Sequence, residues 1–195
     1  MAHQTAAEAA VDWLCAHPSV DSDNICVRGT SFGTYFGTLA AARLGGRIKG
    51  TAVTGVCQEP GCNTIFNMAS PSFKLRFMFM AGYENEGDFD EFIKDFDLRK
   101  CAGDITAPYM VLAGEDDQLS PIEHTYELFT HITAPKRLVV YEGANHSISD
   151  SPAAALGENR NTMMADWFAD RFAGKAMNSE KHFIDAMGRT SVEGF

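Results

Sequence analysis

Residues 24–33 have the sequence Asn-Ile-Cys-Val-Arg-Gly-Thr-Ser-Phe-Gly, which predicts a strand, a sharp turn and the start of a helix. The run 24–28 is short, contains β-branched residues and ends at Gly29, as buried parallel strands often do. From about Phe32 to Leu44 the chain is rich in alanine and ends in two glycines, which is typical of a helix and its stop. This stretch therefore predicts one strand–turn–helix unit.

The rest of the chain alternates between strand-like and helix-like segments. Further strands are expected at 48–56, 108–113 and 138–141, and further helices near 7–14, after Ser120 and at about 161–172. Strands that alternate with helices imply parallel pairing and right-handed crossovers. The predicted fold class is therefore α/β, a parallel sheet flanked by helices.

Two of these helices carry finer expectations. Ser120 and Glu123 form a capping-box pair, and Pro121 is expected at the first helical position. In this helix Ile122, Tyr126 and Phe129 are expected to face the sheet, and in the last helix Met164, Trp167, Phe168 and Phe172 to line one side. After Ala173 a short helix containing Phe183, Ile184 and Met187 is expected.

Residues 57–103 interrupt the alternation and are expected to form an inserted, mostly helical cap. They are crowded with Phe and Met and then become acidic. Most of these side chains would pack the small core of the cap itself. Some would face a substrate pocket, because Met and Phe give an adaptable apolar wall, and Phe66, Phe77 and Met80 are the candidates for substrate binding.

Composition excludes several classes of function. The chain has 195 residues, of which 45% are hydrophobic and 22% charged, so one globular domain is expected. A net charge of -10 would repel phosphate backbones and anionic lipid, which argues against nucleic acid or membrane partners. The start, residues 1–5, lacks the pattern of a secretory signal, and the five scattered cysteines do not form a disulfide framework. A cytoplasmic protein with reduced thiols is expected.

The turn Gly29-Thr30-Ser31-Phe32-Gly33 fits the G-x-S-x-G pattern of a nucleophile elbow. Glycines at its two ends would avoid clashes around a strained backbone. The turn would present Ser31 Oγ above the sheet, and the Phe32 N–H could bind a developing oxyanion. The alternative is a plain turn at the start of a helix.

A serine nucleophile needs a base and a carboxylate that orients the base. The strand at 108–113 ends in an acidic loop, residues 115–117, and the strand at 138–141 is followed closely by His146. Loops at the carboxyl ends of parallel strands open on one edge of the sheet, where active sites form. These loops and the turn at Ser31 are therefore expected to meet.

With these residues the chain resembles the α/β-hydrolase superfamily up to about Phe172. The order Ser, Asp, His is that of the family, and the resemblance selects Asp117 as the acid because it lies four residues before Pro121. The nearest branches are the dienelactone hydrolases, the acyl-peptidase-like esterases and the carbon–carbon hydrolases related to pseudooxynicotine hydrolase. The resemblance implies a core of residues 1–56 and 104–195, and a lid of residues 57–103 above the nucleophile.

Members of the family reach the nucleophile after about four earlier strands, which are absent here. The loop after the third of them supplies the second oxyanion donor, and no His-Gly-Gly-type motif for it occurs in residues 1–30. The strand at 24–28 is therefore expected to have a bare edge. The chain would be the C-terminal part of a longer hydrolase, or would pair across that edge with another chain, such as a second copy.

The leading interpretation is a serine hydrolase that cleaves an ester, thioester or related acyl bond in a small molecule, with Ser31, His146 and Asp117 as the triad. One alternative is a carbon–carbon bond hydrolase acting on a ketone with the same triad. Another is a non-catalytic module that pairs with another chain. No cofactor is expected, and Cys57 and Cys62 are expected to be buried thiols rather than metal ligands.

Overall fold

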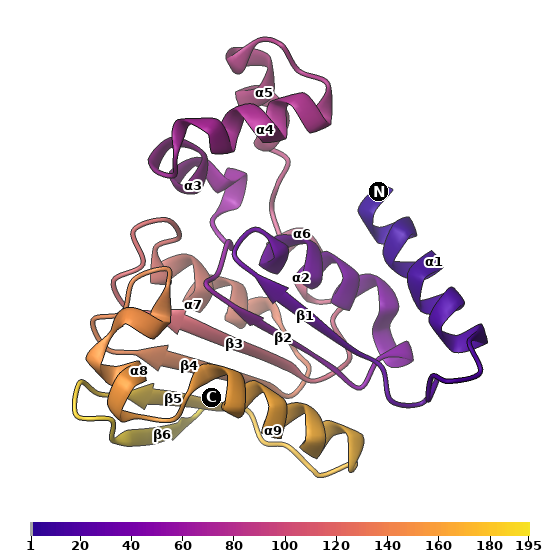
Figure 1. Cartoon of the computed structure of the whole chain (residues 1–195), viewed down its shortest axis with the longest axis vertical. Coiled ribbons are helices and arrows are strands. Elements are labelled where there is room, and N and C mark those ends of the chain that lie inside the picture. Colours follow the sequence, from indigo (N-terminus) through magenta and orange to yellow (C-terminus); the bar gives the residue numbers. More distant parts are fainter. Residues whose placement is uncertain (1) are drawn as a thin grey trace.

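The computed structural model describes residues 2–195, so Met1, the first residue of the segment examined for a secretory signal, lies outside the described residues. Its centre is a six-stranded sheet with the order β1-β2-β3-β4-β5-β6 (Figure 1). The first five strands are parallel and β6 is antiparallel to β5. The strands are β1 (Cys26–Thr30), β2 (Gly50–Thr54), β3 (Tyr109–Gly114), β4 (Lys136–Tyr141), β5 (Glu180–Ile184) and β6 (Thr190–Gly194). The predicted α/β class and parallel sheet are confirmed.

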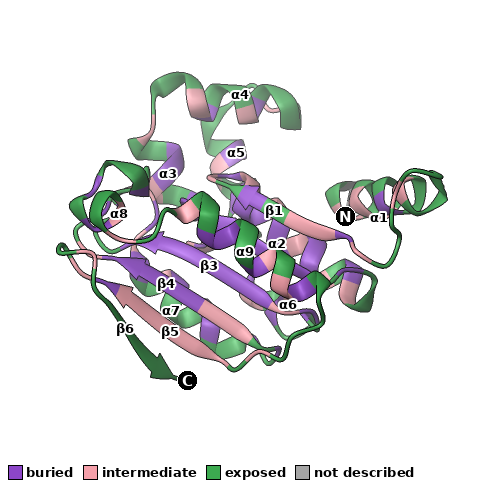
Figure 2. Cartoon of the chain, turned by 60° about the horizontal axis from the view of Figure 1, so that its bottom comes forward, coloured by how far each residue is buried: buried purple, intermediate pink, exposed green. Residues whose placement is uncertain are grey.

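The two faces of the sheet are covered by different helices (Figures 1 and 2). On β3, Val111 packs in the core cluster that contains α2 and α7, whereas Met110 and Leu112 pack in the cluster that contains α9. This alternation follows from the two-residue period of a strand. The covering elements are α1 (Ala2–Ala16), α2 (Gly33–Leu44), η1 (Gly45–Arg47), α7 (Ile122–His131), η3 (Ile148–Asp150), α8 (Pro152–Leu156) and α9 (Arg160–Phe172).

The central strands are the most buried part of the molecule. All six residues of β3 are buried, whereas all five residues of β6 are exposed (Figure 2). Strands covered by helices on both faces need apolar side chains on both, which explains the continuous run Met-Val-Leu-Ala in β3. Within residues 2–195, β1 pairs only with β2 and forms the opposite edge of the sheet from β6.

Residues 57–103, hereafter the helical insertion, rise above the sheet between β2 and β3 (Figure 1). Phe66, Phe89 and Ile93 are buried in it, whereas Leu75 and Phe79 point outward and are exposed. The segment is helical, but its buried side chains do not form the expected separate core, because they belong to the core cluster that also contains α2, β3 and α7. Its helices are η2 (Pro60–Cys62), α3 (Asn63–Met68), α4 (Pro71–Ala81), α5 (Glu86–Ile93) and α6 (Arg99–Ala102).

The predicted helix after Ala173 is wrong, because the chain forms a hairpin there. β5 continues the sheet beside β4, and Ile184 is fully buried. Gly188 takes a φ of 75° in the turn to β6, a conformation that glycine adopts without strain. The free edge of β4 offers hydrogen bonds that a short isolated helix would leave unused.

Four finer expectations about the helices are also wrong. Pro121 has a ψ of 134° and lies before α7, and the Ser120 hydroxyl makes no cap. Tyr126 is exposed, and its ring lies 4.9 Å from Lys181 Nζ, while Leu128 faces the core instead. In α9 it is Phe172 that is exposed.

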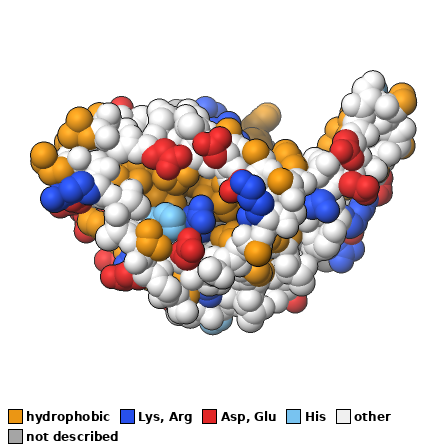
Figure 3. Space-filling model, turned by 90° about the horizontal axis from the view of Figure 1, so that it is seen from below, with side chains coloured by type: hydrophobic (Ala, Val, Ile, Leu, Met, Phe, Trp, Pro, Cys, Tyr) orange, Lys and Arg blue, Asp and Glu red, His pale blue; other side chains and the backbone are white. Residues whose placement is uncertain are grey.

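Charged side chains of both signs are interspersed on the face of the described chain that Figure 3 shows. Near the middle of this face the surface is hollowed, and its floor is formed by apolar side chains. Histidine and charged side chains of both signs lie beside the hollow. None of the helices within residues 2–195 combines the length and the apolar character needed to cross a bilayer.

Candidate active site

The three loops selected from the sequence meet at the carboxyl ends of the strands. Ser31 Oγ lies 2.9 Å from His146 Nε2, and His146 Nδ1 lies 2.9 Å from Asp117 Oδ2. A carboxylate only accepts hydrogen bonds, so Nδ1 carries the proton and Nε2 of a neutral ring accepts from the serine hydroxyl. The three side chains form one continuous chain of hydrogen bonds.

The turn that carries Ser31 has the strained backbone expected of it. Ser31 has a φ of 54°, in the left-handed region that side chains other than glycine rarely adopt. A Cβ at Gly29 would lie 2.5 Å from the Gly33 carbonyl oxygen, so glycine is required there. At Gly33, however, a Cβ would meet nothing within 4 Å, and the expected clash is absent, because the space beside it is open.

Asp117 is held in place by its own loop. Its side chain is 1% exposed, and Oδ1 accepts hydrogen bonds from the backbone N–H groups of Leu119 (2.8 Å) and Ser120 (3.1 Å). These two bonds leave Oδ2 directed at the imidazole. A buried carboxylate with fixed partners is suited to orient a histidine and to stabilise its protonated form.

Two glycines beside the histidine loop were missed in the sequence. A Cβ at Gly114 would collide with the Ala144 carbonyl oxygen, so the close approach of β3 to the histidine loop requires glycine at this position. Gly55 has a φ of 55°, and a Cβ there would lie 2.9 Å from the His146 carbonyl oxygen. Gly114 directly follows the predicted strand at 108–113, and that position could have singled it out, whereas Gly55 lies inside the predicted strand at 48–56 and had no such signal.

A buried polar network supports the loops from below. The Ser120 hydroxyl accepts from the Gln58 backbone N–H at 3.2 Å, and Gln58 Nε2 donates to the Tyr109 hydroxyl at 3.3 Å. Tyr109 Oη lies 2.6 Å from Thr38 Oγ1 on α2. Burial raises the pKa of Tyr109, so its hydroxyl stays neutral. The network ties the acid loop to β3 and α2.

The Phe32 N–H is free to bind an oxyanion, since it has no acceptor among residues 2–195. The Phe32 side chain is buried, and its ring centroid lies 4.3 Å from that of Phe77 and 5.3 Å from that of Phe66. The helical insertion therefore fixes the residue that follows the candidate nucleophile.

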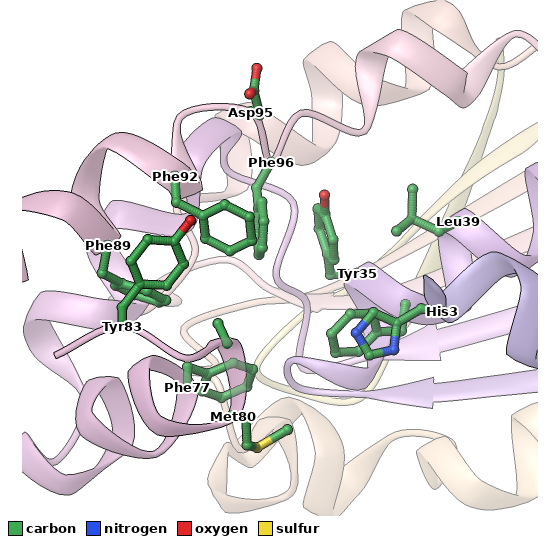
Figure 4. A pocket seen from close by; sticks show the side chains of 12 residues that line it. His3, Tyr35, Leu39, Phe77, Met80, Tyr83, Phe89, Phe92, Asp95 and Phe96 are labelled. Carbon is green, nitrogen blue, oxygen red and sulfur yellow. The ribbon is translucent and has the colours of Figure 1, made fainter. Parts of the chain in front are cut away.

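The three residues predicted to bind substrate differ in their placement. Phe77 and Met80 line a cavity of about 500 Å³ between the helical insertion and α2 (Figure 4), whereas Phe66 is buried in the core and does not line it. Neither Ser31 nor His146 lines this cavity. The cavity is thus separate from the three hydrogen-bonded side chains.

The cysteines are free thiols in this structure. Cys57 and Cys62 are buried, and their Sγ atoms lie 3.4 Å apart. Within residues 2–195 there is no group of three or more His, Cys, Asp and Glu side chains placed to hold a metal ion.

Residues 6–175 match the model of the prolyl oligopeptidase family. The chain belongs to this family. None of the curated proteins matches the chain.

The fold of this member of the prolyl oligopeptidase family is similar to the folds of several solved structures. A 2,6-dihydroxy-pseudo-oxynicotine hydrolase matches with a TM-score of 0.74 and 22% identity, over 89% of this chain and 47% of that one. The acetyl xylan esterase of Paenibacillus sp. R4 matches with a TM-score of 0.61 and 19% identity, over 87% of this chain and 51% of that one. The monoacylglycerol lipase of Paleococcus ferrophilus matches with a TM-score of 0.61 and 16% identity, over 86% of this chain and 74% of that one. The chain spans about half the length of the first two.

These neighbours are named as a hydrolase, an esterase and a lipase. The resemblance to the α/β-hydrolase superfamily seen in the sequence is therefore confirmed. The sheet of this prolyl oligopeptidase family chain corresponds to part of that fold.

Proposed function

We propose that the chain is a serine hydrolase that cleaves an ester, thioester or related acyl bond in a small-molecule substrate. The observation that carries the proposal is the continuous chain of hydrogen bonds from Ser31 through His146 to Asp117, with 2.9 Å at each step. This arrangement turns a hydroxyl, which is a weak nucleophile at neutral pH, into an effective one.

In the proposed reaction Ser31 Oγ attacks the acyl carbon while His146 Nε2 takes the serine proton. Asp117 keeps the ring oriented and stabilises the imidazolium. The Phe32 N–H binds the oxyanion of the tetrahedral intermediate. The imidazolium then returns the proton to the leaving group, and an acyl-enzyme remains. A water molecule, activated by the same histidine, releases the acid and regenerates Ser31.

The test is the Ser31→Ala variant, assayed with p-nitrophenyl acetate. We expect kcat/KM to fall by about 10⁴-fold or more, because the nucleophile is lost. Ser191→Ala, on the exposed strand β6, is the matched control and should retain full activity. A fluorophosphonate probe should label the parent and not Ser31→Ala. Unchanged activity in Ser31→Ala would refute the proposal.

A carbon–carbon bond hydrolase is the second candidate, favoured by the match to 2,6-dihydroxy-pseudo-oxynicotine hydrolase, which has the highest TM-score among the structures reported above. The same triad would serve, and only the pocket would differ. Parallel assays with benzoylacetone and p-nitrophenyl acetate separate the two reactions. Turnover of the diketone alone, lost in Ser31→Ala, would select this candidate over the acyl hydrolase.

We also propose that β1 pairs through its open edge, either with another chain or with further residues of a longer protein. Among the residues that the structure describes, β1 pairs only with β2, so its other edge is unpaired. In a non-catalytic form of this proposal, the chain alone binds its partner but cannot stabilise an oxyanion.

We also propose a reducing, cytoplasmic location, which the five free cysteines support.

A further inference from the structure

The cavity of about 500 Å³ lies between two parts of the molecule that are distant in sequence. α4, α5 and the loops that follow them form one wall, and α2 with His3 of α1 forms the other (Figure 4). Its volume falls within the range of about 300–1,000 Å³ that is usual for small-molecule sites. None of Ser31, Asp117 and His146 lines it.

Aromatic rings form most of the lining, and they are already paired with one another. Tyr35 and Phe96 stack with 4.9 Å between their centroids and 16° between their planes. Tyr83 and Phe92 stack at 5.0 Å and 30°. Rings held by their neighbours lose little conformational freedom when a ligand binds, and they offer both faces and edges to it.

The lining holds two ionisable side chains, Asp95 and His3. Asp95 points away from the rings in Figure 4 and pairs with Lys100 at 3.3 Å, and the His3 ring lies 4.1 Å from that of Phe36. Burial raises the pKa of Tyr35, so its hydroxyl stays neutral and provides a polar group in the wall. The rest of the lining has no charged side chain, so a ligand with a formal charge would lose hydration over most of its surface.

We propose that this cavity is a binding site for an uncharged aromatic small molecule of two or more rings. The Phe32 ring contacts Phe77 of the cavity wall at 4.3 Å, and none of Ser31, Asp117 and His146 lines the cavity. The site is distinct from the proposed acyl-binding site and does not depend on it.

The test is isothermal titration calorimetry of the full chain with naphthol as the probe. Ala81→Trp, at the end of α4, places a large ring in the cavity that Ala81 lines. Ala165→Trp, on the exposed side of α9, is the matched control. We expect saturable binding of one naphthol per chain, weakened by about tenfold or more in Ala81→Trp and unchanged in Ala165→Trp and in Ser31→Ala. Octanol should bind at least about tenfold more weakly than naphthol.

Each other outcome overturns the proposal. Absence of saturable binding removes the site, and equal weakening in Ala165→Trp places the ligand elsewhere. Loss of binding in Ser31→Ala assigns the ligand to the catalytic centre. Octanol binding as tight as naphthol binding assigns the cavity to alkyl chains. Loss of esterase activity in Ser31→Ala is measured separately, so failure here and failure of the proposed function are distinguishable.

Discussion

At the residue scale, the two glycines of the turn around Ser31 have unequal roles. Gly29→Ala would bring a Cβ to 2.5 Å from the Gly33 carbonyl oxygen. We expect the free energy of unfolding to fall by about 1–3 kcal/mol, as overpacking does. Gly33→Ala meets open space and should stay within about 0.5 kcal/mol of the parent. Urea unfolding of both variants checks this, and equal losses would contradict the placement of the turn.

Asp117 and its neighbour Asp116 provide a second matched pair. Asp117→Asn keeps the size of the side chain but removes the charge that orients His146, so kcat should fall by about 10⁴-fold. Asp116 is exposed, and Asp116→Asn should leave kcat unchanged. Steady-state assays with p-nitrophenyl acetate measure both. If Asp116→Asn loses activity while Asp117→Asn stays active, then Asp116 is the acid and the assignment of Asp117 is wrong.

The cysteines give a prediction about pH. Burial raises the pKa of both Cys26 and Cys101 to about 11, and the hydrogen bond to Cys62, with burial, raises that of Cys57 well above its usual value. At pH 8 about one Cys101 thiol in a thousand is then a thiolate, and this fraction rises about tenfold per pH unit below the pKa.

Alkylation by iodoacetamide, followed by mass spectrometry of peptides, measures this. The exposed Cys15 should react first at pH 8, and Cys26 and Cys101 should react about tenfold faster at pH 9 than at pH 8. Cys57 should react only after unfolding. Labelling of Cys57 as rapid as that of Cys15 in the folded protein would contradict its burial.

At the scale of elements, the helical insertion has one inward and one outward apolar face. Phe89 is 1% exposed and its ring lies 5.2 Å from that of Phe66, whereas Phe79 is 87% exposed. Phe89→Ala should lower the free energy of unfolding by about 3–5 kcal/mol. Phe79→Ala should change it by less than about 0.5 kcal/mol. Guanidinium unfolding compares them, and a large loss in Phe79→Ala would show that α4 buries its outer face.

The sequence predicted the first four strands because each is a short apolar run that begins or ends at turn residues. It missed β5 and β6, because Phe183, Ile184 and Met187 also fit a helical spacing. The free edge of β4 favours a strand over a helix here, and that edge exists only once the sheet has assembled. The same holds for Gly55 and Gly114, whose close approach to the histidine loop depends on how separate strands lie together.

At the scale of the whole molecule, the open edge of β1 is the place where another chain is expected to associate. Backbone N–H and C=O groups that are unpaired along an edge favour the addition of another strand. We expect the weight-average mass in sedimentation velocity to rise with protein concentration. A mass equal to one chain at every concentration, with cooperative melting, would rule out self-pairing at this edge.

The position of Ser31, at the end of the outermost strand, has a kinetic consequence. If a neighbour along β1 supplies the second oxyanion donor, the proposed activity belongs to the associated pair and not to the single chain. Dilution would then abolish the activity without unfolding the chain, and the initial rate would be proportional to the square of the protein concentration. Such second-order behaviour would show that the catalytic site is assembled at the junction between two chains.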